Sequence, residues 1–173
     1  GPSAPLFPET FNAILSRAPL LISVESPAFA NNSSIPSKYT CDGLDVSPEL
    51  KISNIPSNTI SIAIIVFDPD APSGTFYHWI LYGIKPSQPL TLPENIGRAE
   101  SIGYGVNGLN SFGRVGYGGP CPPKGDRPHR YIFLVLALDI DSSWTPGLKP
   151  TEFIERVKGH VISYGYIVGL YSR

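Results

Sequence analysis

The chain has 173 residues and a formal net charge of -1 at pH 7, from 13 basic and 14 acidic side chains. This length suits one domain with a sizeable core. The balanced charge, without any run of Lys and Arg, argues against nucleic acid as a partner. The longest apolar runs, residues 60–67 and 132–138, are far shorter than the roughly 20 residues that span a bilayer, so we expect no membrane span.

The terminus and the cysteines leave several properties open. The chain starts with Gly1-Pro2 and contains no methionine, so we expect the initiator residue to have been removed. A soluble cytoplasmic protein and a secreted protein both fit this composition. The only cysteines are Cys41 and Cys121, which are either bonded as a disulfide or are two small buried side chains.

The 19 prolines and 17 glycines cluster between short apolar runs, a pattern typical of strands joined by ordered turns. Residues 8–17 place Phe11, Ile14 and Leu15 at helical spacing, and the flanking prolines keep this first predicted helix short. Strands are then predicted at residues 20–24, 50–52, 60–67, 78–84, 131–138 and 166–171.

A second helix is predicted over residues 151–160, before the last strand. Its apolar face consists of Phe153, Ile154 and Val157. Residues 60–67 and 131–138 are apolar on both pleat faces, as in central strands that are covered on both sides. The sequence therefore predicts a mainly β fold: an antiparallel β-sandwich with a few peripheral helices, one of them near the C-terminus.

The first polar segment, Asp68-Pro69-Asp70-Ala71-Pro72, directly follows a predicted central strand, and His78 opens the next strand. Taken alone, this pattern is explained by turn chemistry, because prolines fix φ and aspartates accept hydrogen bonds from nearby backbone N–H groups. Its position favours a second interpretation. Carboxylates held near a histidine beside an apolar core can have shifted pKa values and can bind or transfer protons.

The second segment, Gly119-Pro120-Cys121-Pro122-Pro123-Lys124-Gly125, leads to His129, Arg130 and Tyr131 at the start of the other central strand. Pleat alternation places His129 and Tyr131 on the same face. These two side chains either satisfy each other in the core or line a pocket. Two polar segments at strand ends in one small domain favour a shared pocket.

Several enzyme classes lack support in the sequence. It contains no Gly-x-Ser-x-Gly elbow and no phosphate-binding loop. Residues 103–108 match Gly-x-Gly-x-x-Gly, but a loop pattern rather than a helix follows them, which argues against a dinucleotide cofactor. A Ser-His-Asp triad stays open, although nothing marks a nucleophilic serine. We expect no cofactor and no metal, since no recognisable metal spacing connects the acceptable ligand types Asp68, Asp70, His78 and His129.

Together, the two segments resemble the two signatures of the phosphatidylethanolamine-binding protein family. The stretch Asp42-Gly43-x-Asp45-x-Ser47-Pro48 and the ending from Gly159-His160 to Arg173 also agree with it. The similarity is to the compact bacterial and archaeal form, which is related to Raf kinase inhibitor-like proteins. It implies a single domain over residues 22–173, preceded by an N-terminal extension, residues 1–21, with a short helix.

The resemblance implies a small pocket for phosphate-like or phosphoethanolamine-like groups, with Tyr77 or Trp79 as an aromatic edge. The implied lining is Asp68, Asp70, His78, His129 and Tyr131, with Gly119, Pro120 and Pro122 shaping one wall. Cys41 and Cys121 lie inside matched motifs, so we expect them to be neighbours. Residues 163–166 are less polar than is usual in the family, so we expect the last helix to end early and the pocket gate to differ.

The resemblance also implies a non-enzymatic protein with a protein target. Ionised Asp68 and Asp70 would repel a bare phosphate, so a zwitterionic ligand fits better. Family members modulate kinases and serine proteases, and for this compact chain we favour serine protease inhibition through residues 89–93 or 109–112. The alternatives are a phospholipid- or anion-binding modulator of kinase signalling and a weak hydrolase that uses the Asp/His pocket. A homodimer is compatible with the sequence.

Overall fold

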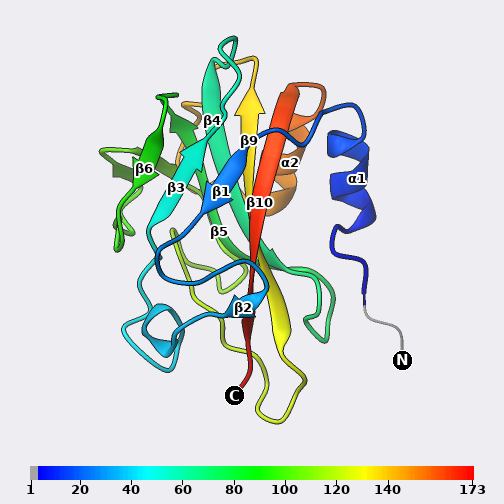
Figure 1. The fold of residues 1–173 in the computed structure, drawn as a ribbon, viewed down its shortest axis with the longest axis vertical. Helices are drawn as coiled ribbons and strands as arrows, with labels where there is room; N and C mark the ends of the chain where they lie inside the picture. Colours follow the sequence, from blue (N-terminus) through cyan, green and yellow to red (C-terminus); the bar gives the residue numbers. More distant parts are fainter. Residues whose placement is uncertain (1–3) are drawn as a thin grey trace.

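The computed structural model describes residues 4–173 and confirms the expected β-sandwich (Figure 1). Gly1-Pro2 lies outside the described residues. A seven-stranded sheet has the order β2-β10-β9-β4-β5-β8-β7, and a three-stranded sheet has the order β1-β3-β6. Within the described residues, no helix is long and apolar enough to cross a membrane.

The large sheet is antiparallel except at the β2–β10 pair. Its strands are β2 (Ser33–Ser34), β4 (Ser61–Asp68), β5 (Phe76–Ile84), β7 (Ser101–Ile102), β8 (Gly105–Asn107), β9 (His129–Leu138) and β10 (Val161–Tyr171). The small sheet consists of β1 (Ser23–Glu25), β3 (Leu50–Ser53) and β6 (Leu90–Leu92). The helical segments are α1 (Glu9–Leu15), the 3₁₀ turn η1 (Ser37–Tyr39) and α2 (Pro150–Val157).

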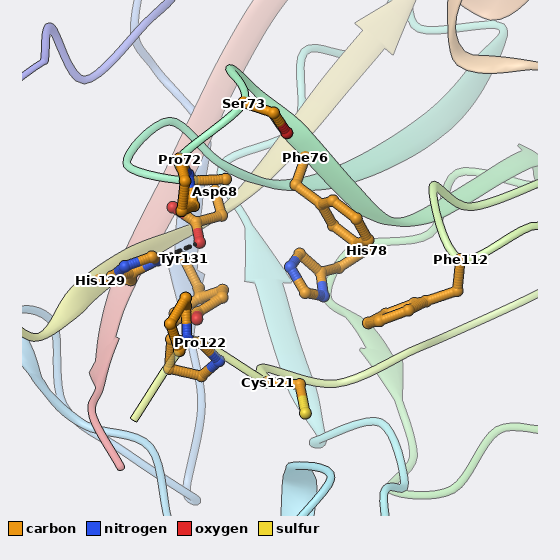
Figure 2. A pocket seen from close by; sticks show the side chains of 12 residues that line it. Asp68, Pro72, Ser73, Phe76, His78, Phe112, Cys121, Pro122, His129 and Tyr131 are labelled. Atoms are coloured by element: carbon orange, nitrogen blue, oxygen red, sulfur yellow. Dashed lines mark hydrogen bonds and ion pairs between the residues drawn. The ribbon is translucent and has the colours of Figure 1, made fainter. Parts of the chain in front are cut away.

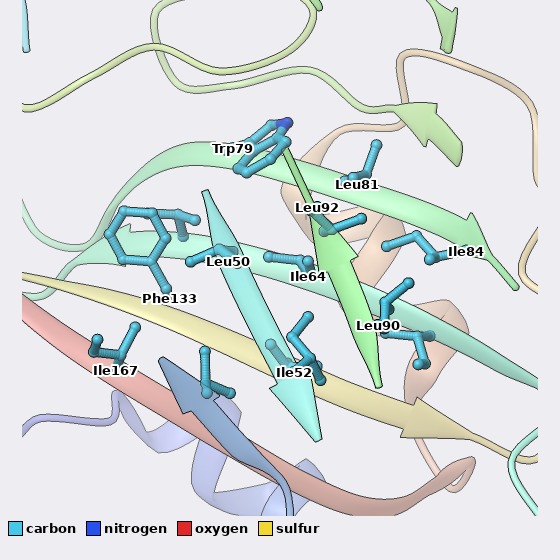
Figure 3. Close-up of a cluster of buried hydrophobic side chains, with 14 of the residues drawn as sticks. Leu50, Ile52, Ile64, Trp79, Leu81, Ile84, Leu90, Leu92, Phe133 and Ile167 are labelled. Carbon is cyan, nitrogen blue, oxygen red and sulfur yellow. The ribbon is translucent and has the colours of Figure 1, made fainter. Parts of the chain in front are cut away.

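The two predicted central strands, β4 and β9, are neighbours in the middle of the large sheet. Every residue of β4 is buried, because both faces of the sheet are covered. One core lies between the sheets, where Ile64, Trp79 and Phe133 meet Leu50 and Ile52 (Figure 3). A second core lies between the other face of the large sheet and the two α-helices.

Helix α1 belongs to the second core. Phe11 is fully buried and stacks on Phe67 of β4 with ring centroids 4.5 Å apart. Ile14 and Leu15, the other predicted apolar positions, are also buried. The division of the chain at residue 21 stays a prediction, but the helix before it packs directly on the large sheet.

Some boundaries differ from the sequence-based expectation. Helix α2 ends at Val157 rather than at residue 160, and β10 begins at Val161 rather than at residue 166. Gly159, at φ +77°, reverses the chain between them. Residues 163–166 therefore lie inside a strand that pairs with β9.

The proposal that residues 89–93 enter a protease cleft is wrong. Leu90 and Leu92 are buried in the core between the sheets, and β6 pairs with β3 along its length. Its two leucines are therefore not available to a partner, and its exposed apolar side chain is Pro89. The strands β2, β6, β7 and β8 were not predicted, because they have only two or three residues each, too few for a periodic signal.

Gly165 of β10 permits the close approach of the segment that precedes β1. The backbone N–H of Ile22 donates to the carbonyl of Tyr164 at 3.1 Å. A Cβ on Gly165 would collide with the carbonyl oxygen of Ile22. Because the backbone fixes the position of this Cβ and the oxygen belongs to the backbone of Ile22, neither can move away without breaking the strand contact.

We predict that Gly165→Ala lowers the free energy of unfolding by about 3 kcal/mol, the scale of an overpacked contact, as measured by urea denaturation. Gly103→Ala is the matched control, because a Cβ there would meet nothing within 4 Å, and we expect it to change stability by less than about 0.5 kcal/mol. Equal stability of the two variants would contradict this packing.

Candidate functional site

A cavity of about 260 Å³ lies at the end of the large sheet where β4 finishes and β5 and β9 begin (Figure 2). It continues the face of the sheet that carries the first core, because Tyr131 belongs to both. Its lining is Asp68, Ala71, Pro72, Ser73, Phe76, His78, Phe112, Cys121, Pro122, Pro123, His129 and Tyr131. The two polar segments singled out in the sequence therefore meet at one cavity.

The charged centre of the cavity is the contact between Asp68 and His129. Asp68 Oδ2 lies 2.6 Å from His129 Nδ1, and both side chains are about 5% exposed or less. Burial raises the pKa of Asp68, and its hydrogen bonds with His129 and with the Asp70 backbone N–H oppose this rise. Burial alone would lower the pKa of His129, but its carboxylate partners raise it above the ordinary value.

The second nitrogen of His129 also faces a carboxylate. His129 Nε2 lies 3.0 Å from Asp126 Oδ2. With both ring nitrogens beside carboxylates, both act as donors, which is the arrangement of an imidazolium. Asp126 was not among the predicted site residues, although its position three residues before His129 is a signal that sequence reasoning could have used.

His78 lies across the cavity from Asp68 and His129 and is neutral (Figure 2). Its Nδ1–H donates to the carbonyl of Gly118 at 2.7 Å, since a carbonyl can only accept. Burial lowers the pKa of His78 to about 4. At neutral pH its other nitrogen, Nε2, is therefore an acceptor. One cavity thus holds two imidazoles of opposite character, one cationic and one neutral.

A β-bulge at His78 aims this side chain at the cavity. In the β4–β5 ladder, Val66 pairs with Trp79 and Phe67 pairs with Tyr77, so His78 is the extra residue. A bulge shifts the pleat by one position. His78 consequently lines the cavity, while its neighbour Trp79 can still pack in the core between the sheets.

The aromatic edge of the cavity differs from the expectation. Trp79 packs in the first core and Tyr77 packs against the second, so neither lines the cavity, and the prediction that one of them would is wrong. Phe76 and Phe112 form the edge instead, with ring centroids 4.7 Å apart in an edge-to-face arrangement. The bulge accounts for Phe76, but no pattern in the sequence points to Phe112.

Tyr131 occupies the buried end of the cavity, next to the charged pair. Its hydroxyl has no hydrogen-bond partner among residues 4–173, and the side chain is only 1% exposed. Burial and the nearby Asp68 carboxylate strongly raise the pKa of Tyr131, so it carries its proton at neutral pH. The cavity therefore contains one buried O–H group that lies near Asp68 but makes no hydrogen bond of normal geometry within residues 4–173.

Asp70 does not line the cavity, and the prediction that it would is wrong. Its carboxylate accepts two hydrogen bonds from the guanidinium of Arg130, at 2.9 and 2.7 Å, and one from the Arg130 backbone N–H at 3.0 Å. Burial alone would raise the pKa of Asp70, but these contacts lower it. Pleat alternation turns Arg130 away from the face that carries His129. Asp70 lies on the same side as Arg130, because it is bound to the Arg130 guanidinium.

The proline loop forms one wall through Cys121, Pro122 and Pro123. Gly119 and Pro120, which were also expected there, lie behind this wall. The N–H of Gly119 donates to Asp45 Oδ1 at 2.7 Å, and a Cβ at this position would collide with the carbonyl of Tyr39. Because prolines lack an N–H, this loop offers few backbone donors to an anion.

A disulfide ties this wall to the segment after η1. Cys41 and Cys121 are bonded, with Cα atoms 5.4 Å apart and a sequence separation of 80. In the chain-entropy model, closing a loop of this length stabilises a protein by about 4 kcal/mol. Arg173 Nη1 also contacts Cys121 Sγ at 3.3 Å. The disulfide to Cys41 and the contact with Arg173 therefore both hold this wall in place.

The four residues considered as possible metal ligands are Asp68, Asp70, His78 and His129. Among the described residues 4–173, no three His, Cys, Asp or Glu side chains converge as metal ligands would. Asp70 is occupied by Arg130, and His78 lies on the far side of the cavity from Asp68. The residue types that could have held a metal are thus distributed over separate contacts.

The sequence profile described as phosphatidylethanolamine-binding protein matches residues 25–172, which is most of the chain. The chain belongs to the phosphatidylethanolamine-binding protein family. A UPF0098 protein of Pyrococcus horikoshii is 48% identical over 151 residues, covering 86% of this chain and 75% of that protein. A UPF0098 protein of Aquifex aeolicus is 42% identical over 92% of this chain and 94% of its own length.

Two solved structures of family members have the same fold. CT736 of Chlamydia trachomatis, described as a putative phosphatidylethanolamine-binding protein homolog, is 37% identical with a TM-score of 0.79, over 88% of this chain and 98% of that chain. YbcL of E. coli, described as a new member of the mammalian family, is 30% identical with a TM-score of 0.81 and the same coverage, 88% and 98%. The chain is thus a compact member of bacterial and archaeal type.

Proposed function

We propose that this family member is a non-enzymatic binding protein whose cavity takes a small ligand with an ammonium and a phosphate group, as in phosphoethanolamine. The observation that carries this proposal is the buried hydroxyl of Tyr131, which has no partner and lies beside an ionised histidine. An unsatisfied buried polar group costs about 1–3 kcal/mol. A ligand oxygen that accepts from Tyr131 would remove this cost.

The charges around the cavity suit a zwitterion better than a bare anion. The carboxylate of Asp68 attracts an ammonium group, and the faces of Phe76 and Phe112 can add cation–π attraction. The donors for a phosphate are the Tyr131 hydroxyl and the His129 imidazolium. Because Asp68 would repel a phosphate that carries no cation, phosphate alone should bind more weakly than phosphoethanolamine.

The contacts of the two histidines support a binding role over a hydrolytic one. Activation of a serine needs a histidine nitrogen that is free to take its proton. Within residues 4–173, both nitrogens of His129 face carboxylates. Nε2 of His78 is an acceptor, but burial lowers the pKa of this ring to about 4, which makes it a weak base. Ser73 lines the cavity, but no contact joins its hydroxyl to either ring in the part of the chain described.

We predict that Tyr131→Phe weakens phosphoethanolamine binding by roughly tenfold, the value of one hydrogen bond to a charged group, as measured by isothermal titration calorimetry. The variant should be at least as stable as the parent, since it loses an unsatisfied hydroxyl. Tyr77→Phe is the matched control, because Tyr77 packs toward the second core. We expect this variant to bind phosphoethanolamine with the affinity of the parent. Equal affinities of parent and Tyr131→Phe would refute the proposed role of this hydroxyl.

Serine protease inhibition is a second proposal, and it is supported by the loop of residues 109–115. The buried side chain of Asn110 accepts hydrogen bonds from the N–H groups of Phe112 and Arg114, at 2.9 and 3.2 Å, and donates to the Gly116 carbonyl at 2.9 Å. Phe112, at the tip, is 39% exposed. A loop fixed in this way loses little entropy on entering an enzyme cleft, and its apolar tip suits a chymotrypsin-like specificity pocket.

We predict stoichiometric inhibition of a chymotrypsin-like enzyme, which Phe112→Ala reduces by at least about tenfold in inhibition constant, the scale of a buried aromatic anchor. Tyr104→Ala removes an aromatic side chain of similar exposure, 43%, from the β7–β8 turn and should have no effect. Chymotrypsin-like, elastase-like and trypsin-like enzymes are titrated in parallel. Absence of stoichiometric inhibition of all three would end this proposal.

A further inference from the structure

We propose that the carboxylate of Asp126 occupies the place on His129 that the ligand's phosphate takes, so that Asp126 sets the affinity of the cavity for anions. The inference deepens the binding function proposed above and rests on it for the identity of the ligand. The two carboxylates that contact the His129 ring, Asp68 and Asp126, differ in exposure to water.

The two contacts of His129 differ in burial. Asp68 Oδ2 lies 2.6 Å from Nδ1, and its side chain is 4% exposed. Asp126 Oδ2 lies 3.0 Å from Nε2, and its side chain is 41% exposed. Water can therefore solvate Asp126 when it leaves the ring, whereas Asp68 would remain as an uncompensated buried charge. The contact at Nε2 can therefore be broken at a lower free-energy cost than the contact at Nδ1.

The local backbone allows Asp126 to move without disturbing the sheet. Asp126 precedes β9, and Gly125 before it adopts φ +90°. The N–H of Asp126 donates to the carbonyl of Pro123 in a long hydrogen bond of 3.3 Å. Across the described residues, the carboxylate of Asp126 makes no hydrogen bond or ion pair with a side chain other than His129. A change of its rotamer thus breaks one contact.

The charge balance shows why an anion would compete for this place. Asp70 is neutralised by Arg130, so the local charges are the His129 cation and the carboxylates of Asp68 and Asp126. Adding a phosphate while Asp126 stays on the ring would put three anionic groups around one cation. If the phosphate replaces Asp126, only two anionic groups, Asp68 and the phosphate, surround the His129 cation. The phosphate then takes the place of Asp126 at Nε2 of His129, whose ring lines the same cavity as Tyr131.

The exchange would also make the cavity select zwitterions over simple anions. The carboxylate lowers the affinity for every anion by the free energy of its own contact with His129. A ligand with an ammonium group regains part of that free energy at Asp68, but a simple anion does not. Asp126 would therefore keep ordinary phosphate out of the cavity while a zwitterion is admitted.

The experiment measures the dissociation constants of inorganic phosphate and of phosphoethanolamine for the parent, Asp126→Ala and Asp139→Ala by isothermal titration calorimetry. Asp139 is the matched control, because it makes the same kind of contact with His160 Nδ1, at 2.8 Å, away from the cavity. We expect Asp126→Ala to bind phosphate roughly five- to tenfold more tightly than the parent, the range of a partly exposed charged contact. The control should match the parent, and Asp126→Asn should lie between parent and alanine variant.

The outcomes separate the two proposals. If the parent binds phosphoethanolamine but Asp126→Ala gains no affinity for phosphate, the role of Asp126 is wrong and the binding function stands. If the parent does not bind phosphoethanolamine but Asp126→Ala binds phosphate, the ligand class is wrong and the competition stands. If no variant binds either compound, both are wrong. A gain of the same size in Asp139→Ala would show a general charge effect and overturn the inference.

Discussion

The cavity depends on one contact, the buried pair of Asp68 and His129. It joins the last residue of β4 to the first residue of β9, the two central strands of the large sheet. Removing one partner of such a pair typically costs about 3–5 kcal/mol, because the other charge stays buried alone. The ladder between these strands, which pairs Phe67 with Ile132, holds the two groups in place. The hydrophobic core thus positions the charged centre.

The other features of the cavity are complementary to that pair. His78 faces it as a neutral ring, because its Nδ1–H is held by a carbonyl and its surroundings are apolar. Tyr131 supplies a buried hydroxyl, and the disulfide-linked proline loop closes one side without adding many backbone donors. The result is a small apolar cavity with one cation, flanked by carboxylates, at one end. Such a site distinguishes ligands by the placement of charge more than by shape.

The sequence predicted the parts of this site that follow from periodicity. Residues that are apolar on both faces marked β4 and β9 as central, and alternation placed His129 and Tyr131 on one face. Two features carried no such signal. The bulge at His78 is a single inserted residue that leaves the composition of β5 unchanged, yet it lets His78 line the cavity beside the core residue Trp79. Phe112 reaches the cavity through the path of a loop, which local patterns do not encode.

The pairing of Asp70 with Arg130 shows a further limit of sequence reasoning. Asp68 and Asp70 look alike in the sequence, but in the structure Asp68 contacts a histidine and Asp70 contacts an arginine. The prediction treated them as one carboxylate pair and so overstated the negative charge in the cavity. Alternation from His129 to Arg130 could have separated them, since neighbouring strand residues face opposite sides.

The most direct test of this account is the pKa of His129, measured from its ring resonances by NMR in the ligand-free protein and in Asp68→Asn. The contacts with Asp68 and Asp126 raise this pKa, so the parent should titrate above about 6.5, the ordinary value, and Asp68→Asn should titrate lower. The protonated ring then contributes stability that is fully present below about pH 6.5 and is lost as the pH rises through the folded-state pKa. A parent pKa at or below about 6.5, or no change in Asp68→Asn, would contradict the account.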